Sequence, residues 1–394
     1  MKVLVADKFP EKYLEEIKSF GLEVIYNPKL GENDLPEAAR EVDILIVRST
    51  VVNAKTIEES KNLSLIIRAG AGVNNIDISA ANKKGIYVSN CPGKNSIAVA
   101  ELTIGLMIAL DRRIPDNVID FRNGIWNKEK YSKAQGLYGK NLGIIGVGNI
   151  GKEVAKRALA FGMNVYGKDI SRIEGVAIKD FSEMDQLLPM CDIITVHLPL
   201  TDQTRNLFDK TMFSYMKDGA LFINTSRAEI VDEEALLWAI ENKGIRAALD
   251  VFKDEPEGKS GTVSSKLRSN PNVYVTHHIG ASTEQAQNAV AEETVRIIKD
   301  YLTSGVIAHW VNKAKISDAK YQLVVKHYDR PGVLANVFKI IHDANINIEE
   351  IENVIFEGGV VACCTMKLRN PLTQDLLNKI RSSKDILSVS HVVV

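Results

Sequence analysis

The chain has 394 residues, 45% of them hydrophobic, and its 49 basic and 50 acidic side chains give a formal net charge of −1. At roughly 100–200 residues a domain, this length predicts two or three domains with sizeable cores. The balanced charge argues against nucleic acid as a partner, and the chain has no run of about 18 apolar residues that would predict a membrane span.

The amino-terminal segment MKVLVADKF is typical of a short strand, and its apolar run is too short for a signal peptide. The chain has four cysteines, Cys91, Cys191, Cys363 and Cys364. Neighbours on a strand point to opposite faces, so the adjacent pair is poorly placed to share a metal ion. We therefore expect reduced thiols, no metal site and a cytoplasmic protein.

Residues 1–90 alternate short apolar runs with amphipathic segments, a pattern typical of an α/β domain with a parallel sheet. The predicted strands are KVLVA, LEVIY, DILIVRS, LSLIIRAG and GIYVSN. A long apolar helix follows from Ser96 to about Leu110, and its composition predicts burial between two layers or two domains.

A second α/β series begins at KNLGIIGVGNIG and contains six predicted strands separated by helices. Six is the strand count of a doubly wound, Rossmann-type nucleotide-binding domain. A long helix follows from about Thr283 to Thr303, and Ser282 with Gln285 predicts a capping box at its start. We expect this helix to return to the first domain, which would make that domain discontinuous.

The last part of the chain is a separate small module. VNKAKISDAK is typical of a polar linker, and the elements beyond it follow the order βαββαβ of a ferredoxin-like fold. The expected organisation is a flavodoxin-like substrate domain (1–95 and 284–312), a nucleotide-binding domain (96–283), a linker (313–319) and the module (320–394).

The stretch GIIGVGNIG places Gly146, Gly148 and Gly151 in GxGxxG spacing between an apolar strand and a helix. In that context the spacing predicts a dinucleotide site. The first glycine permits a tight turn, the second lets the backbone approach a pyrophosphate, and the third lets helix and strand pack closely. The start of the helix, with Asn149 and Ile150, then faces the pyrophosphate charge.

Asp169 lies 18 positions beyond Gly151, at the end of the next predicted strand. A carboxylate there can accept hydrogen bonds from the adenosine ribose and repels a 2′-phosphate, which favours NAD over NADP. An ordinary glycine turn followed by a surface aspartate remains the alternative interpretation.

Three later strands each end in side chains suited to catalysis. Arg227 follows ALFIN, Asp250 and Glu255 follow IRAAL, and His277 and His278 follow NVYVT. The carboxyl ends of parallel strands are where an open α/β sheet builds its site. An arginine can grip a carboxylate with two hydrogen bonds, a histidine can exchange a proton, and a glutamate can hold the imidazole. Taken singly, each of these residues could instead belong to a surface ion pair.

NTSRAEIVDE, LDVFKDEP and HHIGAST resemble the arginine, glutamate and histidine motifs of the D-2-hydroxyacid dehydrogenase family, and the resemblance covers about residues 1–312. It implies NAD-dependent oxidation of a 2-hydroxy acid with Arg227, Glu255 and His278 as catalytic residues. The acid–base histidine of the family is the one that precedes Ile-Gly, which here is His278. His277 stands where the family usually has proline.

The same resemblance implies further contacts to the cofactor and to the substrate. Asp250 matches the residue that contacts the nicotinamide carboxamide. Other segments along the cofactor match at His197, Pro199, Thr225 and Ser226. RAGAGVNNID is similar to the substrate loop of the family, so backbone amides near Gly72 and Val73 are expected to meet the substrate carboxylate.

Arg48 matches a phosphate-binding arginine of the family members that oxidise 3-phospho-D-glycerate in serine synthesis, and Arg68 and Lys128 are further candidate phosphate ligands. A dehydrogenase for 2-hydroxyglutarate or glycerate remains an alternative. So does a nonenzymatic NAD-sensing binding protein on the same fold.

HYDRPGVLANVFKIIHDANINI resembles an ACT domain, a small regulatory fold that binds amino acids. This resemblance implies L-serine as an effector at a subunit interface. His327 and Asn347 fall on two of the serine-holding positions, and Asp329 stands where an asparagine is expected. It also implies a homodimer or homotetramer.

Overall fold

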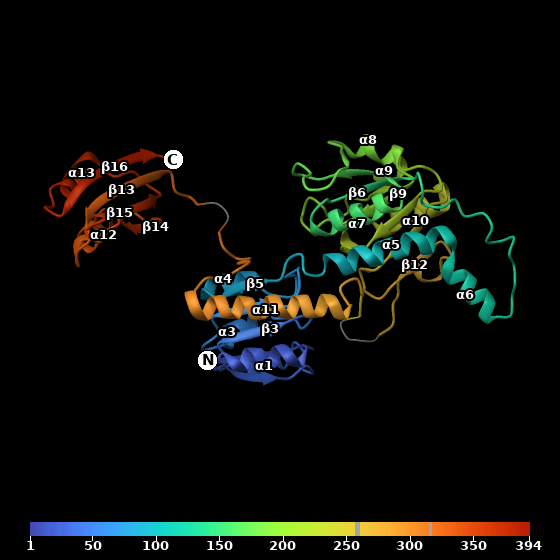
Figure 1. Ribbon diagram of the computed structural model, residues 1–394, viewed down its shortest axis with the longest axis horizontal. Coiled ribbons are helices and arrows are strands. Elements are labelled where there is room, and N and C mark those ends of the chain that lie inside the picture. Colours follow the sequence, from blue (N-terminus) through green and yellow to red (C-terminus); the bar gives the residue numbers. More distant parts are fainter. Residues whose placement is uncertain (257–260, 315–316) are drawn as a thin grey trace. The chain divides into compact units, whose positions relative to one another are not determined.

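The computed structural model describes residues 1–256, 261–314 and 317–394. They form two compact units, Met1–Asn312 and Lys313–Val394 (Figure 1). All four cysteines carry free thiols. Within the described ranges, no helix is long and apolar enough to cross a membrane, and no group of three or more His, Cys, Asp or Glu side chains is arranged to hold a metal ion. The cytoplasmic location stays a prediction.

The first sheet of the larger unit has five parallel strands in the order β2-β1-β3-β4-β5, which is the flavodoxin-like order 2-1-3-4-5. Its strands are β1 (Lys2–Val5), β2 (Glu23–Tyr26), β3 (Ile44–Val47), β4 (Leu65–Arg68) and β5 (Tyr87–Asn90). The helices between them are α1 (Glu11–Ser19), α2 (Leu35–Ala38), α3 (Ala54–Glu59) and α4 (Ile78–Lys84). All four residues of β3 are buried, as expected for a parallel strand covered on both faces, and all five predicted strands are confirmed.

Helix α11 (Glu284–Ser304) packs on this first sheet although it follows the second sheet in the chain (Figure 1). Its residues Val290 and Val295 share one core with Val3 and Ile67. The first lobe is thus built from two chain segments, while its exact boundaries stay a prediction.

The capping box predicted at Ser282 is wrong. The N-cap is Thr283, whose hydroxyl accepts the Ala286 N–H at 3.1 Å. The amide of Ser282 donates instead to Ile279 O in the preceding turn, so the helix begins one residue later.

The second sheet has seven parallel strands in the order β12-β11-β10-β9-β6-β7-β8. They are β6 (Asn141–Ile145), β7 (Asn164–Lys168), β8 (Lys179–Asp180), β9 (Ile193–Val196), β10 (Leu221–Asn224), β11 (Arg246–Leu249) and β12 (Val273–Val275). The strands from β6 to β11 have the order 3-2-1-4-5-6 of a doubly wound dinucleotide-binding sheet, and β12 extends it. The six predicted strands are confirmed. Strand β8 was not predicted from the sequence, because its two residues are polar and exposed and give no apolar signal.

The helices of this second lobe cover both faces of its sheet. They are α5 (Ser96–Arg112), α6 (Ile114–Arg122), α7 (Asn149–Ala160), α8 (Met184–Leu187), α9 (Lys210–Tyr215) and α10 (Glu233–Lys243), with the 3-10 turns η1 (Leu188–Met190), η2 (Ala228–Ile230) and η3 (Lys266–Ser269). Helix α5 contacts α7, β10 and β11 of its own lobe and α11 of the first lobe. The burial predicted from its apolar composition is therefore confirmed.

The smaller unit is an antiparallel sheet of order β14-β15-β13-β16 with two helices, the ferredoxin-like arrangement predicted from the sequence. Its elements are β13 (Tyr321–Tyr328), α12 (Val333–Asp343), β14 (Ile348–Ile355), β15 (Val361–Leu368), α13 (Gln374–Arg381) and β16 (Ile386–Val393). Alternate residues of β13 and β15 pack against the apolar faces of the two helices.

Candidate active site

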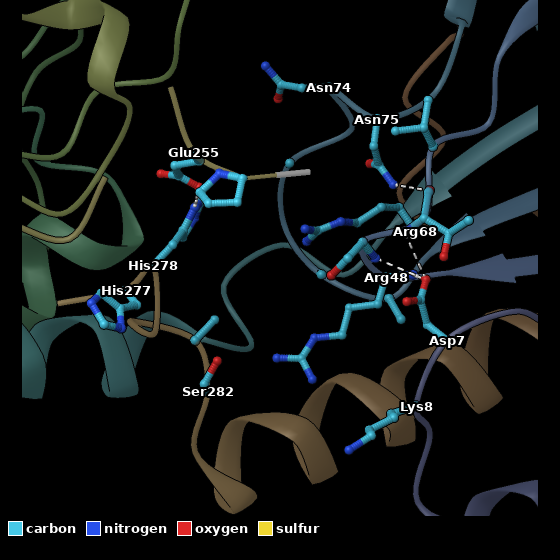
Figure 2. Close-up of a pocket in the computed structure, with 18 of the residues that line it drawn as sticks. Asp7, Lys8, Arg48, Arg68, Asn74, Asn75, Glu255, His277, His278 and Ser282 are labelled. Carbon is cyan, nitrogen blue, oxygen red and sulfur yellow. Dashed lines mark hydrogen bonds and ion pairs between the residues drawn. The ribbon is translucent and has the colours of Figure 1, made fainter. Parts of the chain in front are cut away.

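A cleft of about 1480 Å³ lies in the larger unit where strands of both sheets end (Figure 2). Loops after β1, β3 and β4 line one side, and loops after β10, β11 and β12 line the other. The predicted residues that line the cleft are Arg48, Arg68, Gly72, Arg227, Glu255 and His278, together with His277. Parallel strands therefore bring together residues that are far apart in the sequence, as the rule for strand carboxyl ends predicts.

His278 and Glu255 form a hydrogen-bonded pair in this cleft. His278 Nδ1 lies 2.7 Å from Glu255 Oε2, and Glu255 Oε1 accepts the Phe252 N–H at 3.0 Å. Partial burial raises the pKa of Glu255, but the hydrogen bonds from His278 and from Phe252 outweigh it, and the pKa falls below its usual value. The carboxylate is charged at neutral pH, so Nδ1–H donates to it and Nε2 is left free for a substrate.

His278 has a φ of 50°, in the left-handed region that non-glycine residues rarely occupy. Asp250 holds this turn. One of its carboxylate oxygens accepts from Thr276 Oγ1 at 2.5 Å and from Ile279 N at 2.9 Å, and the other accepts from Gly280 N at 2.8 Å. Asp250 is 1% exposed, so these three bonds form in a dry environment and fix the chain on both sides of the histidine. Sequence reasoning missed this positioning role, and the cofactor contact assigned to Asp250 stays a prediction.

Arg227 follows β10 and reaches toward the loop after β4. Its Nη1 donates to Ser226 O at 2.7 Å, and Asn224 Nδ2 donates to its backbone oxygen at 2.9 Å. A Cβ atom at Gly72 would lie 2.6 Å from Arg227 Nη2, so the absence of a side chain at Gly72 leaves room for the guanidinium. The arginine and the loop amides thus converge where a carboxylate could bind both. Val73 packs its side chain against the first lobe's core.

Arg68 and Arg48 concentrate positive charge on the first-lobe side of the cleft. Burial, followed by the charges of Arg227 and Arg48, lowers the pKa of Arg68 to about 10. Arg68 Nε is buried and has no hydrogen-bond partner among the described residues. The repulsion between these guanidinium groups favours an anionic ligand at this position, and so does the buried Arg68 Nε donor.

Lys128, the third candidate cation, does not line the cleft. It is exposed in the segment that follows α6, where the neighbouring Lys130 pairs with Asp120 of that helix at 2.8 Å. The segment thus contacts α6, and the role of Lys128 as a phosphate ligand stays a prediction.

The glycine loop has the geometry that a pyrophosphate requires. Gly146 has a φ of 92°, and a Cβ at Gly151 would lie 2.3 Å from Gly146 O. A Cβ at Gly148 would meet nothing within 4 Å, and no side chain caps the helix α7 that begins at Asn149. The first amides of α7, at Asn149 and Ile150, are therefore available to a phosphate, and the residues fit a dinucleotide.

The other predicted cofactor residues follow β7, β9 and β10. Asp169 Oδ2 accepts the Val147 N–H at 2.6 Å, a bond to the glycine loop that the sequence did not reveal. Burial lowers the pKa of His197 to about 3, so its imidazole is neutral. Pro199 lies two residues further along this loop. Thr225 and Ser226 are 7% exposed, and Thr225 Oγ1 lies 3.0 Å from Thr103 Oγ1.

The predicted effector residues of the smaller unit do not form a single cluster. His327 is 2% exposed, its Nδ1 lies 2.8 Å from Tyr328 O, and its Nε2 lies 3.3 Å from Asn353 Oδ1. Asn347 donates to Glu349 at 2.9 Å, while Asp329 is exposed. Within the described residues no hydrogen bond joins the three predicted side chains.

The two lobes and the smaller unit have counterparts among known proteins. The family model of the D-isomer specific 2-hydroxyacid dehydrogenase NAD binding domain matches residues 104–280, and that of the ACT domain matches residues 321–352. The D-3-phosphoglycerate dehydrogenase of Methanocaldococcus jannaschii is 36% identical over 388 residues, which are 96% of this chain and 72% of that protein. The chain belongs to the D-isomer specific 2-hydroxyacid dehydrogenase family.

Two further relatives of this dehydrogenase bear on its chemistry. The hydroxypyruvate reductase of Thermotoga maritima is 44% identical over 271 residues, covering 68% of this chain and 88% of that protein. The solved NAD⁺-bound 3-phosphoglycerate dehydrogenase of Entamoeba histolytica is similar with a TM-score of 0.67 at 30% identity, over 79% of this chain and 99% of that chain. The predictions of an NAD-dependent dehydrogenase and of its fold class are confirmed.

Proposed function

We propose that this dehydrogenase oxidises 3-phospho-D-glycerate to 3-phosphohydroxypyruvate with NAD⁺, the first step of phosphorylated L-serine synthesis. The observation that supports this substrate is the cation group of Arg48, Arg68 and Arg227 around the cleft that holds His278. A substrate with a carboxylate and a phosphate at opposite ends matches this charge. Two relatives carry the name of this activity.

In this mechanism Arg227 and the amides near Gly72 hold the substrate carboxylate, while Arg48 and Arg68 hold the phosphate. Glu255 fixes the tautomer of His278, so its free Nε2 takes the proton of the C2 hydroxyl. NAD⁺, held at the glycine loop, supplies the acceptor for the hydride that leaves C2. In the reverse direction the protonated His278 returns its proton to the keto oxygen.

D-glycerate is the second candidate substrate, because the relative at 44% identity is named a hydroxypyruvate reductase. D-glycerate lacks the phosphate but keeps the carboxylate and the C2 hydroxyl, so Arg227 and His278 serve both substrates equally. Only the cations of the first lobe distinguish between them.

Formation of NADH from 3-phospho-D-glycerate, D-glycerate and D-2-hydroxyglutarate tests the proposal. We expect kcat/KM to be at least about a hundredfold higher for the phosphorylated substrate, since each lost charge-assisted contact costs roughly 1.5–3 kcal/mol. Equal values for the two glycerates would refute the phosphate assignment. Absence of turnover with all three would refute each of them as the substrate and would require another 2-hydroxy acid.

We also propose that the ACT unit binds L-serine and that the protein is a homodimer or homotetramer. The ACT family match supports an amino-acid effector. Helix α6 and the segment after it support self-association, since α6 buries none of its residues and Phe121 and Trp126 are 71% and 82% exposed. Light scattering on purified protein gives the assembly size. Initial rates with and without L-serine test the effector, and unchanged rates together with no serine binding by calorimetry would contradict it.

A further inference from the structure

The carboxylate of Asp7 accepts three successive backbone N–H groups at the end of β3. Asp7 Oδ2 lies 2.6 Å from Arg48 N and 3.0 Å from both Ser49 N and Thr50 N (Figure 2). Asp7 follows β1, which pairs in parallel with β3, and the pairing continues to Ala6 N, which donates to Ile46 O at 3.0 Å. The sheet itself therefore brings this side chain to the loop that carries Arg48.

Three successive amides that point at one oxygen make a cradle for an anion. In this protein the cradle is filled from within the chain, because a carboxylate oxygen takes all three donors. The loop lines the same cleft as His278, and Asp7 lines it too. A substrate phosphate must then be bound by the side chains around the loop and not by its amides.

The filled cradle fixes the backbone from which the Arg48 side chain extends. Figure 2 shows the Arg48 side chain reaching into the cleft from the bonded loop, with Lys8 on the neighbouring β1 loop. An arginine side chain loses much conformational freedom when it binds, so a fixed backbone reduces the cost of placing its guanidinium. Asp7 also places a negative charge beside the site proposed for the substrate phosphate, and this charge by itself repels the phosphate.

We propose that Asp7 is a positioning residue for the phosphate end of the substrate, acting through the backbone of residues 48–50. This inference rests on the proposed function. Two effects of Asp7 can be separated. Holding the amides of residues 48–50 requires an oxygen acceptor at position 7, whereas repulsion of the substrate phosphate requires the negative charge of the carboxylate. Asn keeps an acceptor and removes the charge, while Ala removes both.

The test compares Asp7→Ala, Asp7→Asn and Asp43→Ala with the wild-type enzyme. Asp43 is a matched control, because its carboxylate accepts Lys2 N at 2.6 Å and braces the same strand pair at the opposite end, away from the cleft. The measurements are KM and kcat for 3-phospho-D-glycerate and D-glycerate, the melting temperature, and hydrogen exchange of the backbone amides at residues 48–50 without substrate.

For Asp7→Ala we expect KM for 3-phospho-D-glycerate to rise about tenfold or more, with KM for D-glycerate and both kcat values within about twofold of wild type. The amides at 48–50 should lose protection. Asp7→Asn should keep the protection and should have a KM for the phosphorylated substrate no higher than wild type. Asp43→Ala should lower the melting temperature without changing the ratio of the two KM values.

Unchanged protection of residues 48–50 in Asp7→Ala would overturn the inference whatever the substrate proves to be. A lower KM for the phosphorylated substrate in that variant would also overturn it, because the emptied amides would then bind phosphate and Asp7 would be a competitor. If the wild-type enzyme does not prefer the phosphorylated substrate, the proposed function fails by itself, and hydrogen exchange still decides whether Asp7 anchors the loop.

Discussion

The buried carboxylate of Glu293 on α11 gives a stability prediction with a worked magnitude. Glu293 is 3% exposed and pairs with Arg296, with Lys94 at 3.0 Å and with His309 at 2.7 Å. The hydrogen bond from Arg296 lowers its pKa, burial opposes this, and Lys94 and His309 add to the lowering, which brings the pKa to about 2 from an ordinary value of 4.5. At 1.36 kcal/mol per pKa unit, the shift corresponds to about 3 kcal/mol of stability at neutral pH.

Glu293→Gln removes this contribution. Unfolding entropies of about 2.1 cal/mol/K per residue give the unit Met1–Asn312 about 0.7 kcal/mol/K, so its melting temperature should fall by about 5 °C at pH 7. Because the folded pKa is depressed, the contribution is complete above pH 4.5 and is lost as the pH falls toward 2. The loss should reach about 1 kcal/mol at pH 4 and about 2 kcal/mol at pH 3.

Scanning calorimetry of the wild type and Glu293→Gln from pH 7 to pH 3 measures the difference directly. Glu292→Gln is the control, since it makes the same charge change at an exposed position of the same helix. The two melting temperatures of wild type and Glu293→Gln should converge as the pH falls. A difference that stays constant between pH 7 and pH 3 would refute the electrostatic reasoning and assign the loss to packing.

Three site predictions complete the set. Replacing His278 with Asn should lower kcat by roughly 10²–10⁴-fold while His277→Asn keeps turnover within about tenfold, and the opposite result in steady-state assays would reverse the assignment of the base. Asp169→Ala should reduce the preference for NAD over NADP by at least about tenfold in kcat/KM. An unchanged ratio of the two kcat/KM values would show that Asp169 does not recognise the ribose. Gly151→Ala should abolish NAD binding in calorimetric titrations or unfold the lobe, because its Cβ would lie 2.3 Å from Gly146 O, and normal NAD binding would contradict that geometry.

The sequence alone determined most of the strands and the longer helices, together with the positions of the candidate catalytic motifs. Alternating apolar runs and glycine spacing are local signals, since the residues that produce them are neighbours in the chain. For this reason the sequence predicts GIIGVGNIG between a strand and a helix, as the structure has it. It also predicts that Arg227, Glu255 and His278 follow the ends of strands, which the structure confirms. The two-residue β8 lacked such a signal and was missed.

The tertiary structure decided which of these residues meet and what holds them. Asp7 finds the amides of residues 48–50 because β1 and β3 are neighbours in the sheet, and Asp250 braces the turn of His278 because β11 and β12 are neighbours. Hydrogen bonds across 41 or 29 positions leave no periodic trace in the sequence. The contact of the Lys128 segment with α6 is likewise a tertiary feature, since the neighbouring Lys130 pairs with Asp120 of that helix. Local patterns specify which elements form, whereas the order in which the strands pair specifies the partners at their ends.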